Sequence, residues 1–314
     1  MSVRRRSNSE GNVVWNGREG RLRAGWRLLG FVVLLLLVAV VEDRLRVALE
    51  GRLPDLYDGV VRALAFALLV AAVLLLASRI FDRRRVADYG LHVSRRWWAQ
   101  LGLGLGLGAL LMLGTVGLEL AMGWVKITDT LVPAPGQPFA ATILLGLVAV
   151  AAVAFGEEAS YRGYPIKNFT EGLGTSRWAI VASVSIPALY FGAAHVTNPG
   201  ATWLSSTNTV IFGVLFGTAY VMTGELALPI GLHFAWDYIQ AFVFGVVGNG
   251  SHYGAVLVLA PTGAAGARWT GLPYGVEAGA LGTVAMVAGF LLLLAYRRIQ
   301  LCAVPRVTPF EHLY

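Results

Sequence analysis

The stretch FAATILLGLVAVAAVAFGEEASYRGYP, residues 139–165, joins an uninterrupted apolar run to two adjacent carboxylates and an arginine. A helix that crosses a bilayer needs about 17–25 predominantly apolar residues, and this run is long enough to supply most of them. A charged side chain near the bilayer centre costs ~2.5–3.5 kcal/mol on the gentler insertion scales. The stretch therefore predicts a membrane-spanning helix whose charged residues are paired or serve a function.

The rest of the chain has the same apolar character. Of its 314 residues, 56% are hydrophobic and 14% are charged, and the mean hydropathy is +0.65. These values exclude a soluble domain with an ordinary polar surface. Apolar windows of spanning length cover residues 26–41, 59–80, 97–124, 139–161, 178–196, 209–223, 226–247 and 275–296. We therefore predict an all-α fold, a polytopic transmembrane helical bundle of about eight spanning helices.

Basic residues are distributed unevenly between the two sides of these windows. The N-terminal tail and the gap after the second window hold Arg4, Arg5, Arg6, Arg18, Arg21, Arg23, Arg27, Arg79, Arg83, Arg84, Arg85, Arg95 and Arg96. Loops rich in Lys and Arg stay in the cytoplasm, so eight crossings place both termini there, with Arg297, Arg298 and Arg306 also inside. We expect a retained first helix rather than a cleaved signal peptide, because no clear cleavage site follows it.

These cytoplasmic arginines account for the net charge of +7 and also meet anionic lipid headgroups. We therefore expect a multi-pass protein of the cell membrane, with membrane lipid and a peptide or protein substrate as partners and no nucleic acid. The single cysteine, Cys302, excludes a disulfide within the chain and a multi-cysteine metal site. The sequence does not define an oligomeric state.

The chain divides into four parts. Residues 1–25 are charged and rich in Ser, Asn and Gly, which predicts a disordered basic cytoplasmic tail. Residues 26–138 hold N-terminal transmembrane helices, 139–247 a four-helix core, and 248–314 a loop, the last transmembrane helix and a short cytoplasmic tail. In the third window, glycines spaced by four residues indicate close helix packing: Gly102 with Gly106, and Gly104 with Gly108.

The two carboxylates of the fourth window differ in their surroundings. Glu158 and Arg162 lie four residues apart on one helix face, where they can form an ion pair. Glu157 points about 100° away from Glu158 and has no built-in partner. An unpaired carboxyl in an apolar environment is suited to act as a general base. Alternatively, both glutamates mark the cytoplasmic end of the helix and Arg162 extends to the headgroups.

Two later helices hold the other candidates. His233 and Asp237, in LPIGLHFAWDYIQ, are also four residues apart, and a carboxylate can fix the tautomer and orientation of an imidazole. His195, in ALYFGAAHVTNPG, ends an apolar helix that Asn198 and the following Pro-Gly interrupt. Taken alone, His233 and Asp237 are a polar pair that holds neighbouring helices together, and His195 is a residue at a helix end. Their occurrence together with Glu157 indicates one shared polar cavity.

The segments EEASYR, FGAAH and LPIGLHFAWD resemble, in this order, the three motifs of the CAAX prenyl endopeptidase and bacteriocin-processing family of intramembrane proteases. The RGY that overlaps the end of the first motif also matches, and the resemblance covers roughly residues 139–245. It implies cleavage of peptide bonds at or within the membrane. Eukaryotic members remove the last three residues of prenylated CAAX proteins, whereas others process bacteriocin-type peptides, confer immunity to them or have no known substrate.

The resemblance also implies roles for individual residues. Glu157 would be the general base that activates water, and His195 would help to hold that water. His233 and the residue at position 237 would stabilise the oxyanion. The supporting residues would be Glu158, Arg162 and Asn198.

Asp237 departs from the family pattern, in which many members have Asn. An ionised aspartate cannot donate to an oxyanion, so Asp237 is either protonated or orients His233, and we favour orientation. Glu157, His195 and His233 would also supply the two-His, one-Glu set of a catalytic zinc site. Because the sequence contains no HExxH motif, we favour a glutamate-dependent mechanism without metal, with zinc as the alternative.

An estimate of depth conflicts with a shared site. If straight helices enter the bilayer at residues 178 and 226, His195 lies ~25 Å and His233 ~10 Å from the cytoplasmic ends of their helices, at 1.5 Å per residue. For the two to meet, the fifth helix must be tilted or kinked at Pro187, the predicted boundaries must be wrong by a turn or more, or TNPGATW must re-enter the membrane.

We therefore expect an intramembrane endopeptidase of the CAAX protease type, which hydrolyses a peptide bond of a membrane-associated, prenylated or peptide substrate with a glutamate-activated water. One alternative is a proton-coupled or ion-coupled transporter whose pathway contains Glu157, His195 and His233. Another is a bacteriocin-immunity scaffold that binds a partner in the polar cavity without cleaving it. The sequence has no apparent inverted repeat, which disfavours the transporter.

Overall fold

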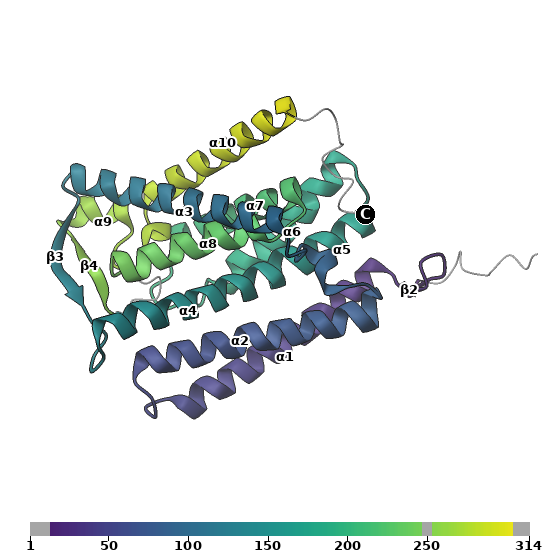
Figure 1. The fold of residues 1–314 in the computed structure, drawn as a ribbon, viewed down its shortest axis with the longest axis horizontal. Helices are drawn as coiled ribbons and strands as arrows, with labels where there is room; N and C mark the ends of the chain where they lie inside the picture. The colour runs from purple at the N-terminus through teal and green to yellow at the C-terminus, as the bar shows by residue number, and fades with distance from the viewer. Residues whose placement is uncertain (1–12, 247–252, 304–314) are drawn as a thin grey trace, which may run out of the picture.

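The computed structural model describes residues 13–246 and 253–303, and Figure 1 shows their arrangement. Its α-helices are α1 (Ala24–Leu49), α2 (Asp55–Ala77), α3 (Arg95–Ala121), α4 (Phe139–Glu158), α5 (Tyr164–Leu173), α6 (Arg177–Ala194), α7 (Trp203–Thr223), α8 (Ala227–Tyr238), α9 (Ala264–Thr270) and α10 (Ala280–Ala303). The π-helical turns are η1 (Ser78–Asp82), η3 (Ala159–Gly163) and η4 (Ile239–Val243), and the 3-10 turns are η2 (Val86–Tyr89) and η5 (Val276–Ala278). Strand β1 (Trp15–Asn16) pairs with β2 (Arg21–Leu22), and β3 (Val125–Val132) pairs with β4 (Ala255–Pro261), both antiparallel.

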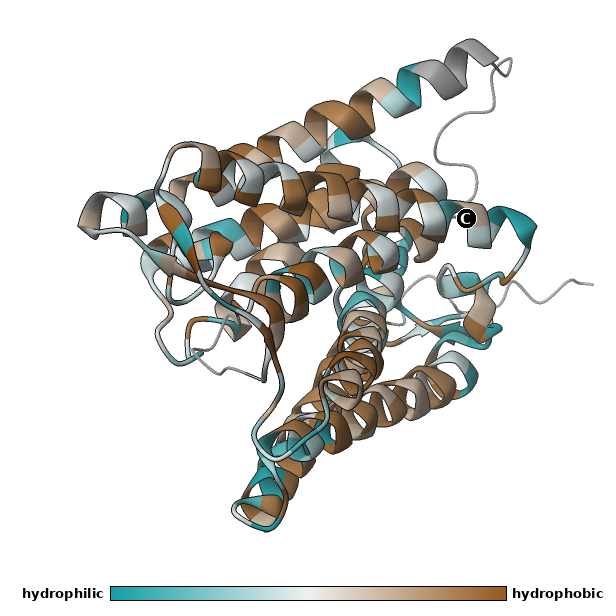
Figure 2. Ribbon diagram, turned by 60° about the vertical axis from the view of Figure 1, so that its left-hand side comes forward, coloured by the Kyte–Doolittle hydropathy of each residue, from teal (hydrophilic) through white to brown (hydrophobic). Residues whose placement is uncertain are grey.

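The described chain contains 7 helical segments that are long and apolar enough to cross a membrane. Hydrophobic residues predominate along the helices in Figure 2, and hydrophilic residues gather at helix ends and connections. The predicted all-α polytopic bundle is therefore confirmed, and the chain is a multi-pass integral membrane protein. The predicted spanning window 226–247 forms α8 instead. Its 12 residues, even with the five-residue π turn η4 that follows, are too short to count among the membrane-spanning segments. Most side chains of α8 are buried, so this helix lies inside the bundle.

When the buried α8 is included, successive long helices run in opposite directions, so their connections gather at two ends (Figure 1). At one end, the Leu226 amide donates to the Gly90 carbonyl at 2.8 Å, which joins the α7–α8 connection to the α2–α3 connection. At the other end, β3 after α3 pairs with β4 after α8, from Val125↔Pro261 to Val132↔Ala255. We call the first the arginine-rich end and the second the far end.

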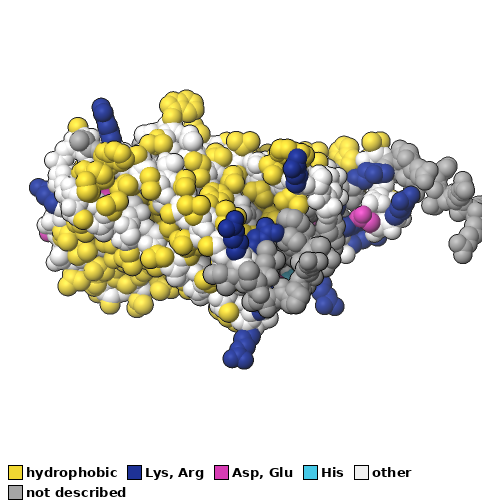
Figure 3. All heavy atoms as spheres, turned by 90° about the horizontal axis from the view of Figure 1, so that it is seen from above, with side chains coloured by type: hydrophobic (Ala, Val, Ile, Leu, Met, Phe, Trp, Pro, Cys, Tyr) yellow, Lys and Arg dark blue, Asp and Glu magenta, His cyan; other side chains and the backbone are white. Residues whose placement is uncertain are grey.

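Basic side chains distinguish these two ends. The arginine-rich end carries Arg18, Arg21, Arg23, Arg27, Arg79, Arg83, Arg84, Arg85, Arg95, Arg96, Lys167, Arg177, Arg297 and Arg298. Described basic residues at the far end are fewer, namely Arg44, Arg46, Arg52, Lys126 and Arg268. Seen from above in Figure 3, hydrophobic side chains cover much of the surface and most Lys and Arg lie toward the right, where Figure 1 places the arginine-rich end.

The predicted disordered tail is wrong for its described part. Residues from Val13 onward form the β1–β2 hairpin and enter α1, which begins at Ala24. The Arg21 guanidinium lies 3.1 Å from the Glu171 carboxylate of α5, and Arg83 stacks over the Trp15 ring at 5.0 Å. These long-range contacts, which the composition of residues 1–25 does not reveal, order the hairpin. The rest of the predicted tail, residues 1–12, lies outside the described residues.

The fourth spanning segment resolves the conflict in depth. The predicted helix boundary was wrong, because helical structure continues through η3 and α5 to Leu173. Gly163 lies level with the start of α8, since a Cβ added to it would be 3.0 Å from the Leu226 side chain. The ten residues of α5 then extend the chain ~15 Å further before α6 turns back, at 1.5 Å per residue. This offset matches the difference in predicted depth, so His195 and His233 can reach the same level.

Glycines bring α3 and α8 into close contact. A Cβ added to Gly104 would meet the Leu228 carbonyl oxygen, and one added to Gly108 would meet the Leu232 carbonyl oxygen. Gly106, on the other glycine face of α3, has no heavy atom within 4 Å of such a Cβ. One of the two predicted glycine faces thus packs against α8, and it fixes the helix that carries His233.

We expect Gly104→Ala to lower the stability of the protein by about 1–3 kcal/mol, the usual range for overpacking, because the added methyl group meets α8 backbone. Gly106→Ala is the matched control on the same helix, and because its methyl group meets open space it should not lower stability. Thermal unfolding of both variants in detergent measures the difference. Equal unfolding temperatures would contradict the close α3–α8 contact.

Candidate active site

A buried ion pair lies where α4 passes into η3. The Nη1 of Arg162 donates to Glu158 Oε1 at 2.8 Å, and the two side chains are 1% and 0% exposed. The guanidinium also lies over the rings of Phe191 and Phe216, at 4.2 Å and 5.1 Å from their centroids. The ion pair expected from the spacing is present, and its burial rules out extension of Arg162 to the headgroups.

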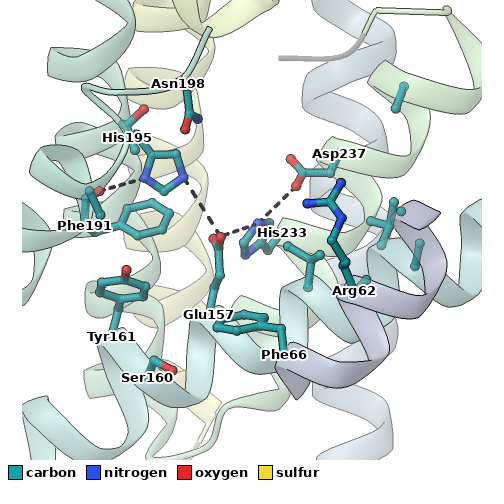
Figure 4. A pocket seen from close by; sticks show the side chains of 18 of the residues that line it. Arg62, Phe66, Glu157, Ser160, Tyr161, Phe191, His195, Asn198, His233 and Asp237 are labelled. Carbon is teal, nitrogen blue, oxygen red and sulfur yellow. Dashed lines mark hydrogen bonds and ion pairs between the residues drawn. The ribbon is translucent and has the colours of Figure 1, made fainter. Parts of the chain in front are cut away.

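Glu157, at the position of α4 that precedes Glu158, faces a cavity instead. Its side chain is 18% exposed, and its oxygens lie 4.0 Å from His195 Nε2 and 3.7 Å from His233 Nε2. Figure 4 shows the carboxylate pointing between the two imidazoles. Three helices, α4, α6 and α8, thus bring together the three groups that sequence spacing alone placed at different depths.

His195 is held by the end of its own helix. It is the C-cap of α6, and its Nδ1 lies 2.7 Å from the Phe191 carbonyl oxygen. A carbonyl only accepts, so Nδ1 carries the proton and the Nε2 of the neutral ring is an acceptor. The acceptor nitrogen of His195 therefore faces Glu157.

His233 lies between carboxylates. Its Nδ1 is 2.8 Å from Glu158 Oε1, and its Nε2 is 3.1 Å from Asp237 Oδ2. Carboxylates accept hydrogen bonds, so both ring nitrogens act as donors. The Phe216 ring stacks on the imidazole with centroids 5.2 Å apart. Glu158 thus connects Arg162 to His233, and Asp237 contacts the His233 nitrogen that is nearest to Glu157.

Asn198 lies on the α6–α7 connection and lines the cavity near His195 (Figure 4). Its side chain lies close to the Tyr274 hydroxyl, which is also close to Ser205. Asn198 therefore links the end of α6 to the segment before α10. It makes no contact with Glu157 among the interactions of the described residues.

The cavity has a volume of about 680 Å³. One part is polar and holds Glu157, His195, His233 and Asp237. The other part runs between the α1–α2 hairpin and the core, and its apolar lining includes Leu35, Val38, Val60, Phe66, Val153 and Phe242. The polar part around Glu157 and the apolar compartment beside the α1–α2 hairpin therefore belong to one continuous cavity.

Two glutamates and one arginine that the sequence did not indicate also line this cavity: Glu42, Glu277 and Arg62. Arg62 donates through Nε to Asp58 Oδ2 at 2.8 Å, and the spacing of four residues was the available signal. Glu277 Oε1 accepts from Trp236 Nε1 at 2.6 Å and from Gln240 Nε2 at 3.1 Å. Burial, and then the charge of Asp237, raise the pKa of the Glu277 carboxyl. Glu277 lies in the short 3-10 turn η5, where residue spacing does not indicate its hydrogen-bond partners.

Among the described residues, the side chains considered for zinc do not have the contacts of a metal site. In the described ranges, no three His, Cys, Asp or Glu side chains are grouped to hold a metal ion. Of the zinc set considered from sequence, His233 has both nitrogens directed at carboxylates, so it offers no free lone pair. The contacts of this donor set thus differ from those of a tetrahedral zinc centre.

Replacing Arg162 with Ala leaves the Glu158 charge buried with His233 as its remaining partner. We expect a loss of about 3–5 kcal/mol of stability, the usual cost of breaking a buried pair from one side. The matched control is Arg46→Ala, which removes an exposed helical pair with Asp43 at 2.8 Å and should change stability little. Thermal unfolding in detergent compares them, and equal shifts would contradict a buried, site-forming role for Arg162.

Comparison with known proteins identifies this region. Residues 139–239 match the model of a family described as type II CAAX prenyl endopeptidase Rce1-like. Neither the curated proteins nor the solved structures that were searched gave a match. The matched segment runs from α4 to the start of η4 and includes the two glutamates, Arg162, both site histidines and Asp237. Residues 139–239 are therefore similar to the type II CAAX prenyl endopeptidase Rce1-like family, in agreement with the resemblance of the three sequence motifs.

Proposed function

We propose that the chain is an intramembrane endopeptidase of the CAAX protease type, in which Glu157 activates water for hydrolysis of a peptide bond. The observation that carries this proposal is the position of the Glu157 carboxylate between His195 and His233, at 4.0 Å and 3.7 Å. The mechanism uses these side chains and no metal. The match of residues 139–239 to a protease family supports the reaction class.

The first step is positioning of the water. Both distances exceed a hydrogen bond, and a water oxygen can lie ~2.8 Å from each end of a 4 Å gap. Glu157 and His195 Nε2 are both acceptors, so the water donates one hydrogen to each. Its lone pairs are then directed away from these two groups, toward the scissile carbonyl carbon of a bound peptide.

The second step is attack and cleavage. Glu157 takes a proton as the water oxygen bonds to the carbonyl carbon, and the carbonyl oxygen becomes an oxyanion. The His233 Nε2–H can share its hydrogen bond between Asp237 and this oxyanion, while Glu158 holds the ring through Nδ1. Glu157 then gives its proton to the peptide nitrogen, the C–N bond breaks, and a new carboxyl group and an amine leave.

The cavity supports a substrate that is partly apolar. Hydrolysis inside a bilayer needs a space that holds water and satisfies exposed peptide groups. The polar part provides this space beside Glu157, and the apolar compartment next to the α1–α2 hairpin can receive a lipid chain or apolar side chains. We propose a membrane-associated or lipid-modified peptide as substrate and the cell membrane as the location.

Glu157→Gln keeps the size of the side chain and removes the base. We expect proteolysis to fall by about 10²–10⁴-fold, the usual contribution of a general base, with unfolding temperature unchanged. Mass spectrometry of a library of membrane peptides incubated with the reconstituted protein measures cleavage. Glu50→Gln, on the exposed end of α1, is the control and should cleave normally. Wild-type rates in Glu157→Gln would rule out the proposed base.

The role of Asp237 is tested by two substitutions at that position. Asp237→Asn keeps an oxygen that accepts from His233 Nε2–H, so activity should largely remain. Asp237→Ala removes that acceptor, and we expect kcat/KM to fall by about 10–100-fold, the range for partners that orient a histidine. Equal activity of the Ala variant and the wild type would show that His233 needs no such partner.

A further inference from the structure

The walls of the catalytic cavity come from one side of the bundle. Besides the site residues, they include the second half of α1, the first half of α2, and residues after α6 and after α8. Asn198, Tyr253 and Tyr274 belong to far-end connections, and all three line the cavity. Among the described residues, the arginine-rich connections 83–94, 174–176 and 224–226 contribute no lining residue. The cavity therefore continues toward the far end.

Buried polar residues close the opposite side. Asp82 accepts from the Tyr89 hydroxyl at 2.7 Å, from Asn168 Nδ2 at 3.0 Å and from the Tyr164 hydroxyl at 3.0 Å. Asp82 is 1% exposed and the other three are 0% exposed. Tyr164 directly follows η3, so this layer lies between the Glu158–Arg162 pair and the arginine-rich end. A peptide that entered from that end would have to break these hydrogen bonds.

Charge gives the two ends an orientation. Basic side chains concentrate at the arginine-rich end, and such loops remain cytoplasmic when a chain inserts into a membrane. The closed side of the cavity is then cytoplasmic, and the far end is extracytoplasmic. The catalytic cavity and this orientation come from independent observations, one from packing and the other from charge.

We propose that Glu157 is reached from the extracytoplasmic side, through the far end of the bundle, and that the substrate is a membrane-anchored peptide segment exposed on that side. This inference rests on the proposed function for the nature of the substrate. A peptide presented from the cytoplasm would meet the buried Asp82 layer instead.

Cysteine labelling tests the access route directly. On a Cys302→Ser background, Ala194→Cys and Ala241→Cys place thiols on two walls of the cavity. Thr175→Cys marks the arginine-rich end, and Asp129→Cys marks the far end on β3. A small membrane-impermeant methanethiosulfonate reagent is applied to intact cells and to inside-out vesicles. We expect Ala194→Cys and Ala241→Cys to react in intact cells together with Asp129→Cys, and Thr175→Cys to react in inside-out vesicles.

Three outcomes would overturn the proposal: cavity thiols that react from the Thr175 side, cavity thiols that react from neither side, or reaction of Thr175→Cys in intact cells. Labelling does not depend on catalysis, so it separates this inference from the proposed function. If Glu157→Gln remains proteolytic while the cavity thiols react from outside, the proposed base fails and the access route stands. If Glu157→Gln is inactive while the cavity thiols do not react from outside, the proposed base stands and the access route fails.

Discussion

The Glu158 carboxylate is the interaction on which the site depends. It is fully buried, with Arg162 on one side and His233 on the other, so it joins the end of α4 to the middle of α8. Such a charge is tolerated inside a membrane bundle only when its partners stay in place. Because Glu158 takes both partners, the adjacent Glu157 is left to face the cavity with two imidazole nitrogens within 4.0 Å.

The sequence predicted much of the fold and of the site from two kinds of periodicity. Apolar windows located the spanning helices, and spacings of four residues predicted the contacts of Glu158 with Arg162 and of His233 with Asp237, both of which are present. These contacts are local to one helix, so helix geometry determines them. The catalytic roles of these residues remain predictions that mutagenesis has to test.

What the sequence did not predict depends on contacts between distant segments. The continuation of α4 into α5 set the level of α6, and a π turn within a polar stretch has no clear hydropathy signal. The short α8 is stable because neighbours bury it, which its own composition does not express. Glu277 reaches the cavity through hydrogen bonds from Trp236 and Gln240, and no spacing within η5 indicates them.

In the proposed mechanism, one water lies between Glu157 and His195 while His233 faces the oxyanion. A high-resolution structure of Glu157→Gln with an uncleaved peptide would show these positions. We expect a scissile carbonyl oxygen within hydrogen-bonding distance of His233 Nε2 and an ordered water between His195 Nε2 and the side chain at position 157. A peptide whose scissile carbonyl lies away from both histidines would contradict it.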